Sequence, residues 1–434
     1  MESRISYADY DVCVVGLGYV GITLTAALLS TGRRVLGYEY NKAVAEDLAA
    51  GVLQLSEPGV EEIVRTSAGD RLHVTSDLAG AKLPPVVIIC VGTPIQTDGQ
   101  DPNLLHLEAA VETVSEGIDD ETLVIVRSTV PVGTTRDLVL PLLRRKVADP
   151  LVAFCPERTI QGKALAELLS LPQIVGGIND EAVRRATELF ASQTPTVVPV
   201  SSLEAAEMIK LICNCHTDLI YGFGNEIALM AEKLGLDAVE LISSANRDYP
   251  RPDLSMPGFV GGSCLTKDPY LLMHALKPHD HTPGMISAAR SLNESLPRRI
   301  GERVMAALWE QGCDPAEAKI LVSGFAYKGQ PETDDLRGAP YEALLELLRG
   351  RVGEIVAHDF AVPRERITAL GLRCVELEEG FTDAHAAVFL NNHLSYRDLD
   401  LDALVARMRP PAVVYDTWRI LPSSAKNVMR LGHA

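Results

Sequence analysis

The stretch DVCVVGLGYVG, residues 11–21, decides the fold class of this chain. Its first half is a continuous apolar run, which is typical of a strand buried on both faces of a parallel sheet. The helical pattern ITLTAALLSTG follows and ends at Gly32, a residue type that commonly terminates helices. A buried strand, a glycine-rich turn and a helix, in this order, predict the first βαβ unit of an α/β domain.

Three glycines shape the turn between that strand and that helix. Gly16, Gly18 and Gly21 form G-x-G-x-x-G, in which the first permits a tight turn, the second lets the backbone approach a pyrophosphate, and the third lets the helix pack on the sheet. Glu39 ends the next predicted strand, where a carboxylate accepts hydrogen bonds from both ribose hydroxyls and repels a 2′-phosphate. Glycines also make plain tight turns, but the strand before the motif and the acid after it favour a site for NAD over one for NADP.

The alternation of strands and helices continues outward from this unit. A long helical periodicity without proline fills 203–245 and predicts a long helix plus a second helix, and a further helical stretch lies at about 284–312. We therefore predict an α/β fold of two Rossmann-like doubly wound domains joined by a long central helix, with boundaries at 1–200, 201–312 and 313–434. Apolar runs predict strands at 11–16, 34–39, 86–92, 123–130, 151–157 and 196–201 in the first domain, and at 318–327, 352–359, 386–392 and 412–417 in the last.

Composition excludes several classes of protein. The chain has 434 residues, of which 47% are hydrophobic and 23% charged, so it can bury the cores of two or three domains. A formal net charge of -18 makes nucleic acid an unexpected partner. The N-terminal residues do not resemble a signal peptide and no apolar run is long enough to span a bilayer, so we expect a cytoplasmic protein without membrane contact. Cys213 and Cys215 form a C-x-C pair without a second pair of ligands, so we expect helix residues and no metal.

Two candidate reactive residues follow predicted strands. Thr129, in RSTVPVGTT (127–135), lies just past a strand end, at the carboxyl edge where open sheets bind ligands. Glu157, in FCPERTIQGK (154–163), follows the next strand and could serve as an acid or base.

A third candidate group lies on the predicted long helix. Glu207, Lys210 and Asn214, in AEMIKLICN (206–214), are spaced i, i+3 and i+7 and share one helix face. An ammonium and an amide side by side stabilise a developing oxyanion. The alternative is a solvated polar face, although the surrounding helix is strongly apolar.

The fourth group is a loop with a cysteine, PGFVGGSCLTKDP (257–269). Gly261 and Gly262 permit close approach of the backbone to a ligand. Cys264 follows them, with Lys267 and Asp268 three and four residues further on. A thiol near a cation ionises more easily and becomes a nucleophile, whereas a lone cysteine is often only a small buried side chain.

Taken together, these segments resemble the UDP-glucose/GDP-mannose dehydrogenase family over essentially the whole chain. The resemblance implies two Rossmann-like domains joined by a long helix, a homodimer built on that helix, and a four-electron oxidation of a UDP-sugar by two NAD. The motifs that carry it, in chain order, are GLGYVG (16–21), VGTP (91–94), STVPVGT (128–134), CPER (155–158), AEMIKxxxN (206–214), NE (225–226), GGSCLTKD (261–268) and FAYKxxxxTDDLR (325–337).

The resemblance also implies roles for single residues. Cys264 is the nucleophile that captures the C6 aldehyde as a thiohemiacetal and becomes a thioester, while Lys210 and Asn214 stabilise the oxygen. Asp268, helped by Thr129, acts on the hydrolytic water, and Glu157 is the acid/base of the thioester stage. The residues implied to bind cofactor are Gly16, Gly18, Tyr19, Val20, Gly21, Glu39, Thr93, Thr129, Lys267 and Arg337, and those implied to bind substrate are Glu157, Arg158, Lys210, Asn214, Arg247, Phe259, Gly261, Lys328 and Arg419.

The branch of the family is marked by conflicting segments. CPERTIQGKALAELLSLPQIVGG (155–177) resembles the UDP-N-acetylmannosamine and UDP-N-acetylglucosamine dehydrogenases, and we expect it to line the sugar side of the cleft. GGSCLTKD instead resembles the UDP-glucose branch, because Ser263 stands where the acetamido-sugar branch has His. Thr217 replaces the Arg of the acetamido-sugar branch, and Trp418 is another departure near the predicted uridine end.

Four functions therefore stay open. The leading hypothesis is a UDP-N-acetylhexosamine 6-dehydrogenase, followed by a UDP-glucose 6-dehydrogenase. A redox-neutral epimerase or dehydratase that cycles hydride on bound NAD, and a non-catalytic nucleotide-binding protein, are more remote. Cys264 together with Lys210 and Asp268 argues against both, because neither has any need of a thioester.

Overall fold

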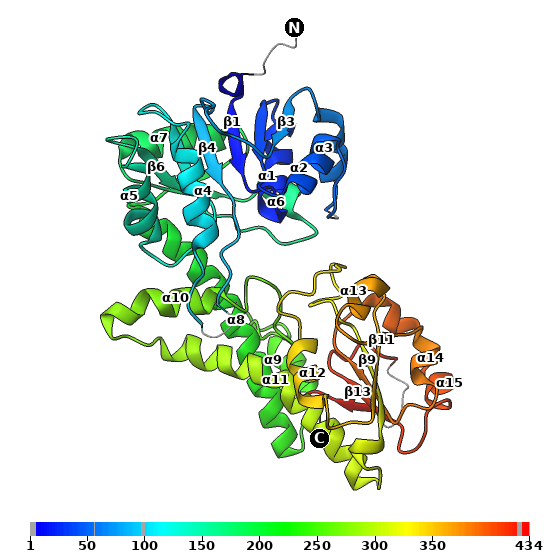
Figure 1. Ribbon diagram of the computed structural model, residues 1–434. Coiled ribbons are helices and arrows are strands. Elements are labelled where there is room, and N and C mark those ends of the chain that lie inside the picture. The colour runs from blue at the N-terminus through cyan, green and yellow to red at the C-terminus, as the bar shows by residue number, and fades with distance from the viewer. Residues whose placement is uncertain (1–5, 56, 97–99, 423–427, 434) are drawn as a thin grey trace. The chain divides into compact units, whose positions relative to one another are not determined.

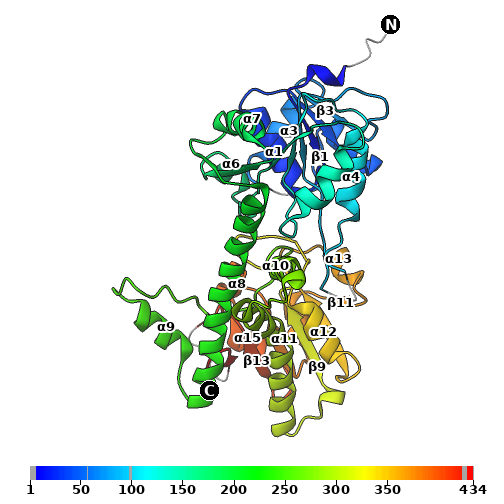
Figure 2. The ribbon, with the colours of Figure 1, turned by 90° about the vertical axis from the view of Figure 1, so that its left-hand side faces the viewer.

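The structure is a computed structural model that describes residues 6–55, 57–96, 100–422 and 428–433 (Figures 1 and 2). It divides into two compact units, each built on its own sheet. Unit 1 comprises Met1–Cys213 and Tyr270–His281, and unit 2 comprises Asn214–Pro269 and Thr282–Ala434. None of the described helices is long and apolar enough to cross a membrane.

The sheet of unit 1 has the order β3-β2-β1-β4-β5-β6-β7-β8 among the described residues. All neighbours are parallel except β6 and β7, which pair antiparallel. The six predicted strands of this domain are confirmed. The strands are β1 (Val12–Val15), β2 (Val35–Tyr38), β3 (Leu72–Thr75), β4 (Val86–Ile89), β5 (Leu123–Val126), β6 (Leu151–Phe154), β7 (Gln173–Gly177) and β8 (Val197–Pro199).

Two strands of this sheet, β3 and β7, have no clear signal in the sequence. The first has only four residues, LHVT, and lies at the edge of the sheet with alternate residues half exposed. The second, QIVGG, ends in two glycines, which weaken strand propensity. This places the end of segment 155–177 inside the sheet, and only its earlier residues in a loop.

Helices cover both faces of the first sheet (Figure 1). Apolar side chains of α1, α2, α3 and α7 pack on one face, and those of α4, α5 and the start of α8 pack on the other. The helical elements are η1 (Tyr7–Asp9), α1 (Tyr19–Ser30), α2 (Lys42–Ala49), α3 (Val60–Ser67), α4 (Leu105–Ser115), the π-helical turn η2 (Thr135–Val139), α5 (Leu140–Leu143), α6 (Ala164–Leu168) and α7 (Asp180–Ala191).

The predicted long helix and second helix are confirmed as α8 (Leu203–Leu234) and α9 (Ala238–Asn246). Cys213 and Cys215 lie within α8, as expected. In unit 2 the residues of α8 run beside α11 (Gly284–Glu310), which contains Pro297 (Figure 2). Between α9 and α11 the chain forms the cysteine loop, α10 (Asp268–Leu276) and the short turn η3 (Lys277–His279).

The sheet of unit 2 has the order β11-β10-β9-β12-β13-β14, and every pair of neighbours is parallel. Its four predicted strands are confirmed, whereas β11 and β14 have two and three residues and were not predicted. The elements are η4 (Pro315–Glu317), β9 (Lys319–Ser323), α12 (Tyr341–Leu348), β10 (Glu354–His358), α13 (Arg364–Thr368), β11 (Arg373–Cys374), α14 (Leu377–Phe381), β12 (Ala386–Phe389), η5 (Leu394–Asp398), α15 (Leu401–Val405), β13 (Val413–Asp416) and β14 (Val428–Arg430).

The first turn of the second sheet repeats that of the first. Gly16 and Gly324 both have positive φ, 85° and 95°, and follow the first strand of their sheets. Glu39 Oε2 accepts a hydrogen bond from the backbone N–H of Leu17 at 2.9 Å. Asp359, at the equivalent end of β10, accepts one from Phe325 N–H at 2.5 Å. This repeat is not apparent in the sequence because it needs only one glycine and one acid, and it confirms that both units are Rossmann-like.

Candidate active site

The glycine-rich turn of unit 1 is closely packed at Gly21 and open at Gly18. A Cβ on Gly21 would lie 1.8 Å from the carbonyl oxygen of Gly16, so α1 packs on the turn with no space for a side chain. A Cβ on Gly18 would meet no atom of the described residues within 4 Å, so packing does not require glycine there. Glycine at this place, before the N-terminus of α1, suits backbone approach to a pyrophosphate. The turn therefore fits NAD.

Glu39 is buried beside this turn. Besides its bond to Leu17, its Oε1 accepts a hydrogen bond from Asn41 N–H at 3.1 Å. These two backbone bonds hold the carboxylate at the end of β2, and each oxygen retains a lone pair for a ribose hydroxyl. The acid is thus pre-positioned for the role the sequence predicts.

The two predicted threonines of the cofactor site are linked to each other. Thr93 is buried, and its hydroxyl donates to the carbonyl oxygen of Thr129 at 2.5 Å. Ser128 makes a parallel link, because its hydroxyl donates to the carbonyl oxygen of Val91 at 2.7 Å. The segments that follow β4 and β5 are therefore joined at the carboxyl edge of the sheet, and Thr129 is held by its backbone.

Glu57 was missed by the sequence analysis, because it lies in a loop without a pattern. Its buried carboxylate accepts three hydrogen bonds, from the Tyr19 hydroxyl at 2.6 Å and from Gly162 and Ala164 N–H at 2.7 Å each. Burial and the bond to Glu57 raise the pKa of Tyr19. Glu57 thus ties the glycine-rich turn to the loop after β6.

That loop contains Glu157 and Arg158. The carboxylate of Glu157 accepts a hydrogen bond from Thr159 N–H, and its charge is close enough to raise the pKa of Tyr19 further. The guanidinium of Arg158 donates to the carbonyl oxygen of Pro172 at 2.5 Å. The structure therefore brings Glu157 near the cofactor turn, whereas Arg158 stabilises its own segment.

The polar face of α8 is buried, so the alternative of a solvated face is wrong. Glu207 is 1% exposed and Lys210 5% exposed. Glu207 accepts hydrogen bonds from Gly133 N–H at 2.6 Å and from Thr135 N–H at 2.8 Å, and so supports the STVPVGT segment. Burial raises the pKa of Glu207 to about 7, although these hydrogen bonds oppose the shift.

In unit 2 the structure brings Asn214, Cys264, Lys267 and Asp268 together. Asp268 is fully buried, and one of its oxygens accepts from Asn214 Nδ2 at 2.5 Å while the other pairs with Lys267 Nζ at 2.8 Å. The carbonyl oxygen of Cys264 accepts from the N–H groups of Lys267 and Asp268, which places exposed Cys264 directly before α10. Lys267, predicted to approach NAD, is therefore bonded to the neighbouring acid.

The two glycines before Cys264 are required by packing. A Cβ on Gly261 would lie 2.7 Å from the carbonyl oxygen of Gly338, and one on Gly262 would lie 2.9 Å from the Tyr327 ring. Burial raises the pKa of Tyr327, with further contributions from the charges of Asp335 and Cys264.

Arg337, predicted to approach NAD, lies on the segment that packs against this loop. Its guanidinium forms a forked pair with Asp335, at 2.7–3.1 Å. That hydrogen bond raises the pKa of Arg337, and the charge of Cys264 adds a smaller contribution. A cation and a phenol thus belong to the segment that packs against the glycines before Cys264.

The remaining predicted substrate residues lie apart from one another in unit 2. Phe259 is buried in the core, so its side chain serves packing. Arg247 is exposed at the end of α9, and Lys328 lies over the Tyr327 ring. Arg419 pairs with Asp237 at 2.8 Å.

The three departures from the family pattern have different surroundings. Trp418 packs on Gly258, where a Cβ would lie 2.4 Å from its ring, and its indole N–H donates to Leu390. It therefore fills a packing position. Ser263 Oγ lies 3.9 Å from Cys264 Sγ, and Thr217 is half-buried on α8.

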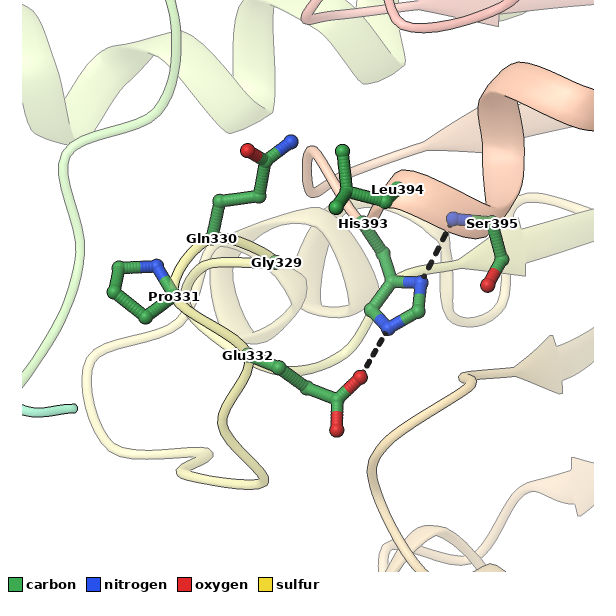
Figure 3. A pocket seen from close by; sticks show the side chains of 7 residues that line it. All are labelled: Gly329, Gln330, Pro331, Glu332, His393, Leu394 and Ser395. Atoms are coloured by element: carbon green, nitrogen blue, oxygen red, sulfur yellow. Dashed lines mark hydrogen bonds and ion pairs between the residues drawn. The ribbon is translucent and has the colours of Figure 1, made fainter. Parts of the chain in front are cut away.

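A pocket of about 560 Å³ opens at the carboxyl ends of β9 and β12 in unit 2 (Figure 3). Glu332 and His393 both line it and are hydrogen-bonded to each other, with Glu332 Oε2 2.6 Å from His393 Nε2, and His393 Nδ1 accepts from Ser395 N–H at 3.2 Å. This is the position where the strand order of the sheet reverses, the usual place for ligands of open α/β sheets. Sequence reasoning missed His393. Within the described residues, no cluster of three metal-binding side chains occurs.

This fold and site define a class of NAD-binding oxidoreductases, with an exposed cysteine, Cys264, directly before α10. Comparison with known proteins agrees over the whole chain: residues 10–194, 204–295 and 321–423 match the NAD binding, central and UDP binding domains of the UDP-glucose/GDP-mannose dehydrogenase family. The chain belongs to this family.

Similar proteins include dehydrogenases of several nucleotide sugars. The UDP-N-acetyl-D-mannosamine dehydrogenase of Pyrococcus horikoshii is 34% identical over 93% of this chain and 94% of its own. The NDP-N-acetyl-D-galactosaminuronic acid dehydrogenase of Ralstonia nicotianae is 31% identical over 96% and 97%. Among solved structures, the UDP-D-ManNAc dehydrogenase of P. horikoshii superposes with a TM-score of 0.88 at 33% identity, covering 97% of this chain and 99% of its own.

We predict that two alanine substitutions in the glycine-rich turn affect different properties, one the affinity for NAD and the other the stability of the fold. Gly18→Ala should leave the melting temperature without NAD unchanged, because its Cβ meets no protein atom, but should weaken NAD binding by roughly tenfold or more, since the added carbon occupies the approach to the pyrophosphate. Gly21→Ala should lower the melting temperature, because overpacking of this kind typically costs about 1–3 kcal/mol. Calorimetric titration with NAD and thermal unfolding measure the two effects. An unchanged NAD affinity in Gly18→Ala would contradict the placement of the cofactor.

Proposed function

We propose that this enzyme oxidises the C6 alcohol of a UDP-N-acetylhexosamine to the carboxylate, with UDP-N-acetyl-D-mannosamine as the first candidate substrate and UDP-N-acetyl-D-glucosamine as the second. The observation that carries the proposal is the cysteine turn of unit 2. There, exposed Cys264 precedes buried Asp268, and Asp268 is held by Asn214 and Lys267. A redox-neutral enzyme has no use for such a cysteine.

The proposed reaction passes through two covalent states of Cys264. NAD held at the glycine-rich turn by Gly16, Gly18 and Glu39 would supply the oxidation, with one molecule of NAD for each of the two hydrides that leave C6. After the first hydride and the hydroxyl proton have left, the Cys264 sulfur attacks the aldehyde carbon, and the carbonyl oxygen takes up a proton to give a thiohemiacetal. Loss of the second hydride and of that proton leaves a thioester, which water cleaves to the carboxylate and the free thiol.

Other residues of the chain take the supporting roles. Lys210 and Asn214, four residues apart on α8, stabilise the oxygen while it gains charge. The Asn214 amide has two N–H groups, of which one is bonded to Asp268, so the second can serve the oxygen. Asp268 and Thr129 orient the hydrolytic water, and Glu157 transfers the proton at the thioester stage.

The acetamido-sugar substrate is supported by sequence similarity at two scales. The segment 155–177 resembles that branch, and relatives above 30% identity have names of acetamido-sugar dehydrogenases. The UDP-glucose alternative is favoured by Ser263 beside Cys264, and a UDP-glucose dehydrogenase structure from Pyrobaculum islandicum superposes with a TM-score of 0.84 at 25% identity over the full length of both chains. We give the 155–177 segment more weight, because C6 chemistry at Cys264 is common to both branches.

We also propose a homodimer through α8. Phe223, Met230 and Leu234 lie on one face of this helix, within about 40° of each other at 100° per residue. All three side chains are exposed in the single chain, Phe223 by 49% and Leu234 by 71%. A row of exposed large apolar side chains on one long helix is typical of a protein interface.

Replacing the nucleophile is expected to separate binding from chemistry. Cys264→Ser should abolish nearly all formation of the sugar acid, because a hydroxyl is a far weaker nucleophile than a thiolate, while the affinity for NAD stays within about twofold. Acid formation is measured by mass spectrometry and NAD binding by calorimetry. Full turnover in this variant would exclude the covalent mechanism.

The substrate is tested by comparing UDP-N-acetyl-D-mannosamine, UDP-N-acetyl-D-glucosamine and UDP-glucose under the same conditions. The acetamido sugar should be preferred over UDP-glucose by roughly 10²-fold or more in kcat/KM, if a buried polar partner of the N-acetyl group is left unpaired by glucose. Two NADH should form for each acid. A preference for UDP-glucose would overturn the branch but not the reaction.

The dimer is tested with a charge on the exposed face of α8. Phe223→Asp should convert the protein from dimer to monomer in light scattering, because a buried unpaired carboxylate is costly at an interface. Leu105→Asp, an exposed apolar position on α4, is the matched control and should leave the dimer intact. A wild-type monomer at micromolar concentration would contradict the proposal.

A further inference from the structure

A chain of buried polar side chains lies behind the cysteine loop of unit 2. Arg290 on α11 and Asp218 on α8 are 2% and 1% exposed, and Arg290 Nη1 pairs with Asp218 Oδ1 at 2.8 Å. Asn293, one turn further along α11, donates to the same carboxylate oxygen at 2.9 Å and to the Asp218 carbonyl oxygen at 3.0 Å. Its own side-chain oxygen accepts from Asn225 Nδ2 at 2.9 Å.

This network contacts the cysteine loop at two points. Asn225 Oδ1 accepts a hydrogen bond from the backbone N–H of Gly258 at 2.8 Å. Arg290 Nη1, the nitrogen that pairs with Asp218, also donates to the carbonyl oxygen of Leu265 at 2.9 Å. The two contacts hold the backbone before and after the segment 259–264, so the residue next to Cys264 is bonded to a fully buried arginine.

Stability alone does not account for such an arrangement. Replacing a buried ion pair by apolar side chains of similar volume is often neutral or stabilising, since two charges must be removed from water. Burial raises the pKa of Asp218, although Arg290 opposes the shift. What the polar network supplies, and an apolar core would not, is directed hydrogen bonds to the loop backbone.

We propose that Arg290, held by Asp218, is a positioning residue for Cys264. By fixing the Leu265 carbonyl it sets the position of the sulfur relative to the C6 carbon that the sulfur must attack. The inference rests on the proposed role of Cys264 as nucleophile. Bond formation is sensitive to position, and a misplacement of about 1 Å can cost roughly 10²-fold in rate.

The effect should be confined to the steps in which sulfur takes part. Arg290 and Asp218 are buried between α8 and α11, and neither is itself a predicted binding residue for NAD or the nucleotide sugar. The first hydride departs from C6 of the alcohol before any bond to sulfur forms. Capture of the resulting aldehyde, in contrast, requires a bond between C6 and the Cys264 sulfur. Displacement of Cys264 should therefore lower kcat and allow the aldehyde to accumulate, with little change in the KM of either substrate.

The experiment uses a double variant, Asp218→Asn with Arg290→Met, because removing Arg290 alone would leave a buried unpaired carboxylate and could prevent folding. The matched control is Glu232→Gln with Arg303→Met, an ion pair between the same two helices that does not contact the loop. Arg290→Lys tests rescue, because one ammonium nitrogen can donate to both Asp218 and Leu265, as Nη1 does. All variants are assayed at saturating NAD with the sugar that the wild type turns over.

We expect the double variant to keep a cooperative melting transition and to lose kcat by roughly 10²-fold, with KM values within about twofold and aldehyde trapped by hydroxylamine. The control should retain kcat, and Arg290→Lys should recover most of it. A folded double variant with wild-type kcat, or an equal loss of kcat in the control, would overturn the positioning role. Neither result would affect Cys264, whose role fails only if Cys264→Ser still forms the acid.

Discussion

The contact between Gly21 and the Gly16 carbonyl is the constraint on which unit 1 depends. The distance is so short that no side chain fits, and it brings the start of α1 directly onto the end of β1. Because of this contact the N-terminus of α1 lies at the carboxyl end of β1, the strand next to β4, where its N–H groups suit a phosphate. The cofactor site follows from this geometry, since Glu39, Thr93 and Thr129 all lie at strand ends of that edge.

Buried polar side chains then hold the loops that the sheet leaves irregular. Glu57 binds Tyr19 and the loop after β6, Glu207 binds the segment after β5, and Arg290 binds the cysteine loop. In each case a side chain from a helix or a distant loop satisfies backbone groups that no strand or helix can pair. Loops that carry chemistry need such anchors, because a few tenths of an ångström at the reacting atoms matter more than the net stability of the contact.

The second sheet shows how little sequence a nucleotide-binding turn requires. Gly324 and Asp359 reproduce the positions of Gly16 and Glu39, but the carboxylate of Asp359 accepts backbone bonds from Phe325, Ala326, Ala361 and Val362. The Asp359 carboxylate thus accepts four backbone hydrogen bonds, whereas the Glu39 carboxylate accepts two. Asp359 therefore has fewer lone pairs left for a ligand and stabilises the turn of the second sheet. The pocket of this unit lies further along and is lined by Glu332 and His393.

The sequence by itself determined the elements whose signals are local. Such signals are the apolar runs of the strands, the helical periodicity of the 32-residue α8 and the glycine spacing at 16–21. Each reflects packing within one continuous stretch of chain and can be recognised without the rest of the fold. Short strands such as β3 and β11 were not predicted, because two to four residues are too few to show a pattern of apolar residues. The candidate reactive residues were found by motif, including Cys264, Asn214 and Asp268, which the structure brings together.

Only the tertiary structure decided which polar groups are anchors. Glu57, Asp218 and Arg290 have no local pattern, since the hydrogen-bond partners of each side chain lie more than 20 residues away in the chain. These hydrogen bonds exist only after the helices have packed. The same holds for Glu207, which shares a helix face with Lys210 but binds the segment after β5. It also holds for Trp418, a departure from the family pattern whose ring packs against Gly258. Sequence patterns record which face of an element is buried, whereas the partner of a buried polar group depends on the whole fold.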